Sequence, residues 1–74
     1  MIYLFDEKLF RIKLIERDVN LTKISEVLNI NLVTLYRKMN GLSDFYRDEI
    51  QKICDYLNLN LEEREDIFFS KKIT

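Results

Sequence analysis

The chain has 74 residues, of which 47% are hydrophobic and 34% charged, and its net charge is −1. A domain usually takes about 100 to 200 residues, so we expect a single domain over residues 1–74, with a core too thin for a deep enzyme cleft. The absence of His and the single Cys exclude histidine acid–base chemistry, multi-ligand zinc sites and a disulfide framework. We therefore expect a protein that is not an enzyme, needs no cofactor or metal, and resides in a reducing, cytoplasmic setting. No apolar run approaches the roughly 20 residues that span a bilayer, so no membrane partner is expected.

Charge is divided unevenly along the chain. Up to Gly41 there are 7 basic and 5 acidic residues, a balance of 7 − 5 = +2, and beyond it 5 basic and 8 acidic residues, a balance of 5 − 8 = −3. Because the whole chain does not attract nucleic acid, a polyanion would have to meet the first half. Ordinary solvated helix faces explain the same asymmetry equally well.

A first helix is expected over residues 6–17. Asp6 is suited to cap its start, and five apolar residues form a wide helical stripe, namely Leu9, Phe10, Ile12, Leu14 and Ile15. With no Pro and one Gly in the chain, the composition is that of a helical domain with short polar connections.

Two short helices are expected next, three residues apart. Asn20 is a good N-cap for the first of them, and Asn29 can end it because Asn tolerates a left-handed conformation. Asn31 can cap the second helix, which runs to the stop signal at Asn40 and Gly41.

The second half of the chain predicts two more helices. The fourth begins at Asp44 or just after it, and its apolar residues follow helical spacing: Ile50, Ile53, Cys54 and Leu57. Asn60 and Glu63 form a capping-box pattern for a fifth short helix that contains Ile67 and Phe68. The end segments 1–5 and 69–74 are open to three interpretations: frayed ends, a short strand pair, or a dimer contact.

The stretch Asn20 to Gly41 resembles the helix-turn-helix of the phage repressor and Cro family. Asn29 stands where the family usually has a turn Gly, which is acceptable because Asn also adopts positive φ. Five positions fit the packing that this motif requires: Ile24 and Leu28 face inward, Ser25 is small where the helices cross, Ile30 fills the turn, and Leu35 anchors the second helix.

The resemblance covers almost the whole chain. Residues 41–45, 48–57 and 61–73 are similar to short Cro-like regulators of phages and prophages of Gram-positive bacteria. This similarity implies an all-α, five-helix, lambda repressor-like fold, with the helix-turn-helix at about residues 20–41. It also implies a transcriptional regulator that binds double-stranded operator DNA, as a homodimer.

Carried over by position, the third helix would lie in the major groove of operator DNA. Arg37 could bind guanine O6 and N7, contributing ~1 to 3 kcal/mol of discrimination, whereas aliphatic side chains can only touch thymine methyl groups. The resemblance implies eight DNA-binding residues: Leu32, Val33, Tyr36 and Arg37 at reading positions, Asn40 on the backbone, and Thr22, Lys23 and Lys38 on phosphates.

Several of these residues have other interpretations. Leu32 and Val33 occupy positions that are usually polar in this family, so they either touch thymine methyls, bury against another protein, or turn inward. Tyr36 suits a structural role as well as a DNA contact. A second hypothesis is therefore an antirepressor, which uses the same surface to bind a partner repressor protein.

Two further features have ordinary structural explanations. Cys54 lies on the apolar stripe of the fourth helix and is expected to be a small buried hydrophobe. The acidic group at 62–66 coincides with a helix start, where the helix dipole favours negative charge, and this explanation is preferred to a metal site.

Overall fold

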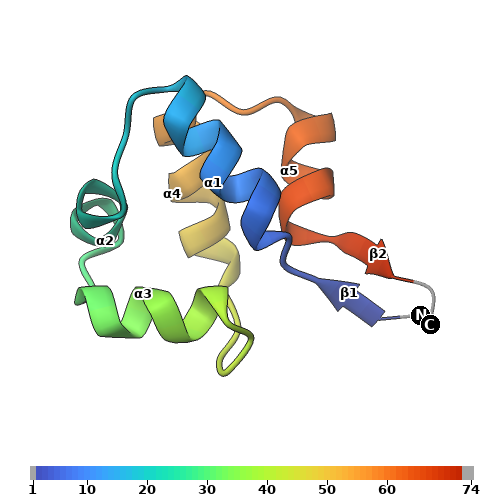
Figure 1. The fold of residues 1–74 in the computed structure, drawn as a ribbon, viewed down its shortest axis with the longest axis horizontal. Helices are drawn as coiled ribbons and strands as arrows, with labels where there is room; N and C mark the ends of the chain where they lie inside the picture. Colours follow the sequence, from blue (N-terminus) through green and yellow to red (C-terminus); the bar gives the residue numbers. More distant parts are fainter. Residues whose placement is uncertain (1, 73–74) are drawn as a thin grey trace.

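Five helices and a two-stranded ribbon form the fold (Figure 1). The computed structural model describes the backbone of residues 2–72 and the side chains of residues 4–70. Met1, Ile73 and Thr74, which belong to the two end segments, lie outside the described residues. The elements are β1 (Ile2–Leu4), α1 (Glu7–Glu16), α2 (Leu21–Leu28), α3 (Leu32–Met39), α4 (Arg47–Leu57), α5 (Leu61–Phe68) and β2 (Ser70–Lys72).

Side-chain caps explain where four of the helices begin. An Asp or Asn oxygen accepts a backbone N–H of the first turn at 2.7 to 2.9 Å in each case, a contact that is typically worth about 1 kcal/mol. The capping residues are Asp6 for α1, Asn20 for α2, Asn31 for α3 and Asn60 for α5. These four caps are the predicted ones.

The fourth helix begins without such a residue. Its first helical residue is Arg47 and its N-cap is Tyr46, two positions beyond Asp44. The Glu49 carboxylate reaches back and accepts the backbone N–H of Tyr46 at 2.8 Å. This glutamate therefore satisfies the backbone N–H of the N-cap residue. At the other four helices the N-cap side chain instead accepts an N–H of the first turn.

The helices share one buried core. Each of them contributes a side chain with no exposed surface, in chain order Phe10, Ile24, Leu35, Ile53 and Ile67. The helix α2 packs against α3 and α4, and α1 packs against α5. Cys54 is 5% exposed within this core, and burial raises the pKa of its thiol. The prediction that Cys54 is a small buried hydrophobe is confirmed.

Four phenylalanines connect the loop after α3 to the rest of the core. The rings of Phe5, Phe10, Phe45 and Phe68 lie 4.8 to 6.3 Å from one another in the contacting pairs. Because edge-on and tilted aromatic pairs at these distances are favourable, the loop that holds Phe45 is fixed against Phe5, which precedes α1, and against Phe68 of α5.

Charged contacts join the end of α1 to the start of α5. Lys13 Nζ lies 2.8 Å and Arg17 Nη2 lies 3.6 Å from the Glu63 carboxylate. Arg17 Nε also donates to the carbonyl of Leu57, at the end of α4, at 3.0 Å. The hydrogen bond from Lys13 is the largest cause of the lowered pKa of Glu63, and the same bond raises the pKa of Lys13. Glu63 thus stabilises the contact between α1 and the start of α5. Among the described residues no group of three or more acidic side chains is arranged to hold a metal ion.

The two ends of the chain pair as a short antiparallel ribbon. The strand β1 pairs with β2, with Ile2 opposite Lys72 and Leu4 opposite Ser70. Of the three interpretations of the end segments, the structure shows the strand pair. The predicted five-helix, lambda repressor-like fold is confirmed, with this ribbon added to it. Within residues 2–72 no helix has the length and apolar character needed to cross a membrane.

Candidate nucleic-acid interface

The connection between α2 and α3 is a tight bend. Asn29 adopts a left-handed conformation with φ 56° and ψ 44°, and the Ile30 N–H donates to the Ser25 carbonyl at 3.0 Å. Asn31 then caps α3 through the Thr34 N–H at 2.7 Å. The predicted bend at residues 29–31 is confirmed, and Asn29 replaces the turn Gly as expected.

The inward faces of both helices are as predicted. Ile24 and Leu35 are completely buried and Leu28 is 5% exposed, whereas Ile30 is partly buried in the turn. Ser25 is 6% exposed, and its hydroxyl donates to the Thr22 carbonyl at 2.6 Å. This packing fixes the rotation of α3 about its own axis and therefore decides which of its residues point outward.

The outward face of α3 carries four of the eight candidate DNA-binding residues. Val33 is 62% exposed and Tyr36 is 40% exposed, and Arg37 and Asn40 are also exposed. The helix lies along the lower edge of the molecule in Figure 1, away from α1 and α5. Its outward side is thus open to a macromolecule as large as a DNA duplex.

Leu32 and Val33 point in different directions. Leu32 is partly buried and packs against the core, whereas Val33 faces solvent. Of the interpretations open for this pair, Leu32 turns inward, and only Val33 remains free to meet a thymine methyl or another protein.

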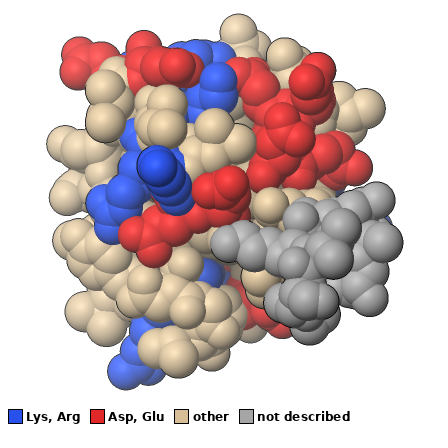
Figure 2. Space-filling model, turned by 45° about the vertical axis from the view of Figure 1, so that its right-hand side comes forward, with Lys and Arg blue, Asp and Glu red and all other residues tan. Residues whose placement is uncertain are grey.

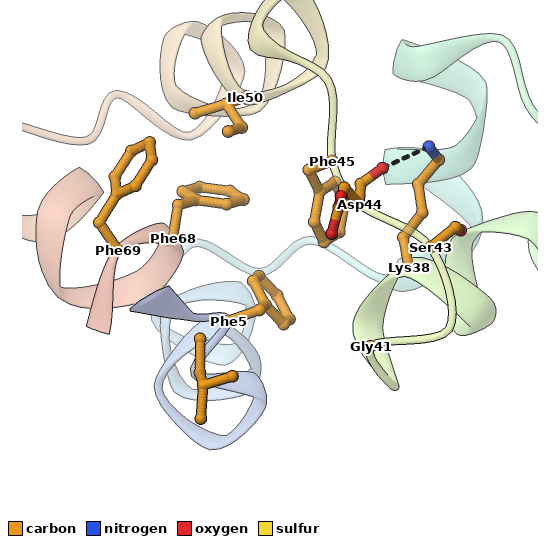
Figure 3. Close-up of a pocket in the computed structure, with 10 residues that line it drawn as sticks. Phe5, Lys38, Gly41, Ser43, Asp44, Phe45, Ile50, Phe68 and Phe69 are labelled. Atoms are coloured by element: carbon orange, nitrogen blue, oxygen red, sulfur yellow. Dashed lines mark hydrogen bonds between the residues drawn. The ribbon is translucent and has the colours of Figure 1, made fainter. Parts of the chain in front are cut away.

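Lys38, which was expected to contact phosphate, is buried in this structure. Its side chain is 5% exposed and turns away from the open face of α3. The ammonium group donates to the Asp44 carbonyl at 2.9 Å (Figure 3). It also lies 3.0 Å from the Glu49 carboxylate. In this structure Lys38 is therefore held inside the molecule by Asp44 and Glu49.

This buried contact joins α3 to the beginning of α4. The same Glu49 oxygen that pairs with Lys38 also accepts the Tyr46 N–H, and the Lys38 ammonium lies 4.2 Å from the centre of the Tyr46 ring. The partner acid lies 11 positions further along the chain, since 49 − 38 = 11, in a different helix. The sequence gives no local signal for it.

The two remaining candidate residues lie on α2. Thr22 and Lys23 are exposed, and Lys23 is 3.8 Å from Glu26, an exposed pair of little strength. Thr22 and Lys23 thus lie on the surface of α2, the helix that packs against α3.

The stretch from the end of α2 to the loop after α3 carries few charged residues. Residues 27–43 include no Asp or Glu, and their only basic residues are Arg37 and Lys38. Because Glu49 neutralises Lys38, Arg37 remains as the free cation of this stretch. In Figure 2 the acidic side chains gather mainly in the upper right, and the lower edge, at the level of α3, is mostly uncharged.

The comparison with known families agrees with this geometry. Residues 10–63 match the family of Cro/C1-type HTH DNA-binding domains, a range that includes α2, the turn and α3. No curated protein and no solved structure matches the chain. The matched range is more than half of the 74 residues. The chain therefore belongs to the family of Cro/C1-type helix-turn-helix DNA-binding domains.

Proposed function

We propose that this protein is a sequence-specific transcriptional regulator of the phage or prophage Cro-like repressor type, which binds operator DNA through α3. The observation that carries the proposal is the division of α3 into two faces. Leu35 holds one face in the core, while Val33, Tyr36 and Arg37 stand exposed on the other. A helix anchored in this way can present fixed side chains to the base edges of a major groove.

Each exposed residue has a chemical role in this proposal. Arg37 donates two hydrogen bonds to a guanine, and Val33 makes apolar contact with a thymine methyl group. Asn40, Thr22 and Lys23 contact the sugar–phosphate backbone, which sets the register of the protein without reading sequence. The N–H groups at the start of α3 support phosphate binding in the same way.

The size of α3 favours a homodimer. The helix has eight residues and is about 12 Å long, so one copy reads only a few base pairs. Two copies related by a twofold axis would read two half-sites about 34 Å apart. Operator recognition with useful specificity therefore requires a second copy of this chain.

The direct test is an anisotropy titration with duplexes selected from a random DNA library. Wild-type protein should bind the selected duplex in the nanomolar to micromolar range, and Arg37→Ala should weaken binding by at least about tenfold. Arg11→Ala is the matched control, because Arg11 is exposed on α1 and paired with Glu7. Absence of any selected sequence at low salt, or equal effects of the two substitutions, would contradict the proposal.

A second candidate function is that of an antirepressor, and one observation favours it. Val33, near the start of α3, is 62% exposed, and Leu42, just after its end, is 76% exposed, and few charged residues lie between them. Such a surface suits a partner repressor protein. In that case Val33→Ala would abolish co-purification with the partner, whereas Arg37→Ala would leave it intact. Leu32 is unsuitable for this comparison because it contacts the core.

A further inference from the structure

A cavity of about 400 Å³ lies between the start of α4 and the middle of α5, outside the candidate DNA surface. It is lined by Phe45, Arg47, Ile50, Arg64 and Phe69. The two arginines come from different helices, so the fold brings two basic residues to the lining of one cavity. Phe45, Ile50 and Phe69 also border the adjoining aromatic cavity of Figure 3.

Both arginines lack a counter-ion within the described part of the chain. No carboxylate of residues 4–70 forms an ion pair with Arg47 or Arg64. The Arg64 Nε is also buried and, among the described residues, has no hydrogen-bond partner. Buried polar groups are usually satisfied, so a buried donor on an unpaired guanidinium needs an explanation.

We propose that this cavity binds a small organic anion, with Arg47 and Arg64 holding a carboxylate or phosphate group and the apolar residues holding its hydrocarbon part. Guanidinium groups bind both anions through charge-assisted, often paired, hydrogen bonds. Aromatic walls suit a ring or alkyl chain next to the anionic group, and the volume falls within the usual range of ligand pockets, about 300 to 1,000 Å³. This inference is independent of DNA binding.

The position of the cavity also matters for α3. Phe45 and Arg47 flank Tyr46, whose N–H and ring both contact the group formed by Lys38 and Glu49. An anion in the cavity would thus lie beside the two sequence neighbours of Tyr46.

The test uses NMR titration of the 15N-labelled protein with phenyl phosphate, phenylacetate and inorganic phosphate as probes. The Arg64 Nε–H signal should shift on addition of at least one aromatic anion and saturate with a Kd of about 1 mM or tighter. Whichever of phenyl phosphate and phenylacetate binds with the lower Kd shows whether the site prefers a phosphate or a carboxylate. Inorganic phosphate should bind several-fold more weakly because it leaves the apolar wall empty.

Three variants decide the outcome. Arg47→Gln and Arg64→Gln should each weaken binding about tenfold, whereas Arg37→Gln, which removes the same charge from α3, should not. Because Arg64 is partly buried, the folding of its variant is checked by circular dichroism, and exposed Arg47 provides the second, independent test. No saturable shift, equal binding of inorganic phosphate, or equal loss in Arg37→Gln would overturn the proposal.

Discussion

Replacing Lys38 by Met tests the buried contact between α3 and α4. Methionine keeps most of the aliphatic stem but removes the charge, which leaves the Glu49 carboxylate 8% exposed and without its cation. Breaking a buried pair by removing one partner typically costs about 3 to 5 kcal/mol. We expect the lower end, about 3 kcal/mol, because Glu49 keeps the hydrogen bond from the Tyr46 N–H.

Such a loss is large for this domain. At about 0.05 to 0.15 kcal/mol per residue, a chain of 74 residues has an unfolding free energy of about 4 to 11 kcal/mol. Thermal and urea unfolding followed by circular dichroism should therefore show a Tm lower by about 12 to 24 °C. The control Lys52→Met, which changes an exposed lysine 4.0 Å from Asp48, should shift stability by no more than about 0.5 kcal/mol.

The double variant Lys38→Met with Glu49→Met makes the test specific. Apolar residues of similar size replace buried ion pairs at little cost, so most of the stability should return. The remaining loss is about 1 kcal/mol, because the Tyr46 N–H loses its acceptor. If the two single substitutions added without coupling, or if Lys38→Met left Tm unchanged and weakened DNA binding, the structural role of Lys38 would be refuted.

Three further predictions concern pH, the turn and salt. The pKa of Glu63 is lowered on folding, so the ionised carboxylate stabilises the protein at pH above the ordinary glutamate value of 4.5, and this stability is lost as pH falls through the folded pKa. Glu63→Gln should therefore lower Tm at pH 7 and make the fall of Tm with decreasing pH shallower than in the wild type. An equally steep fall of Tm in the variant would contradict this. Asn29→Ala should cost about 1 kcal/mol in urea unfolding because Ala is strained at positive φ, whereas Asn29→Gly should be neutral or stabilising. Even if Lys23 and Arg37 of both copies all neutralised phosphates, the slope of log Kobs against log salt should be no steeper than about −4, so a slope near −5 or −6 would mean that Lys38 also reaches phosphate.

Local side-chain chemistry made most of the helix boundaries predictable. Asp6, Asn20, Asn31 and Asn60 act on N–H groups only three residues away, so their effect is visible in a short sequence window. The start of α4 was harder because Tyr46 is not a usual N-cap and depends on Glu49 for its contact. A helix start that depends on the third helical residue is hard to predict when the N-cap residue is not one of the usual capping types.

The candidate site was predictable only in part. The spacing of Ile24, Leu28 and Leu35 indicated the buried faces, and burial confirms them. The directions of Leu32 and Lys38 could not be predicted, because each depends on what the rest of the fold places beside it. Lys38 in particular meets Glu49 and Asp44, which are brought to it by the loop after α3.

The burial of Lys38 has a consequence for how an operator would be recognised. With Arg37 as the free cation of residues 27–43, the non-specific attraction to phosphate is small. If the protein recognises an operator as proposed, discrimination between sequences would then depend more on direct contacts to bases and less on general affinity.

The ribbon of β1 and β2 leaves residues 2 and 72 directly opposite each other. A short peptide linker could join these positions, and new ends could be opened at the exposed residues 42–44. Such a circular permutant would keep all five helices and make the pairing of β1 with β2 local in the sequence, whereas the contacts of α4 with α2 and with Lys38 would become more distant.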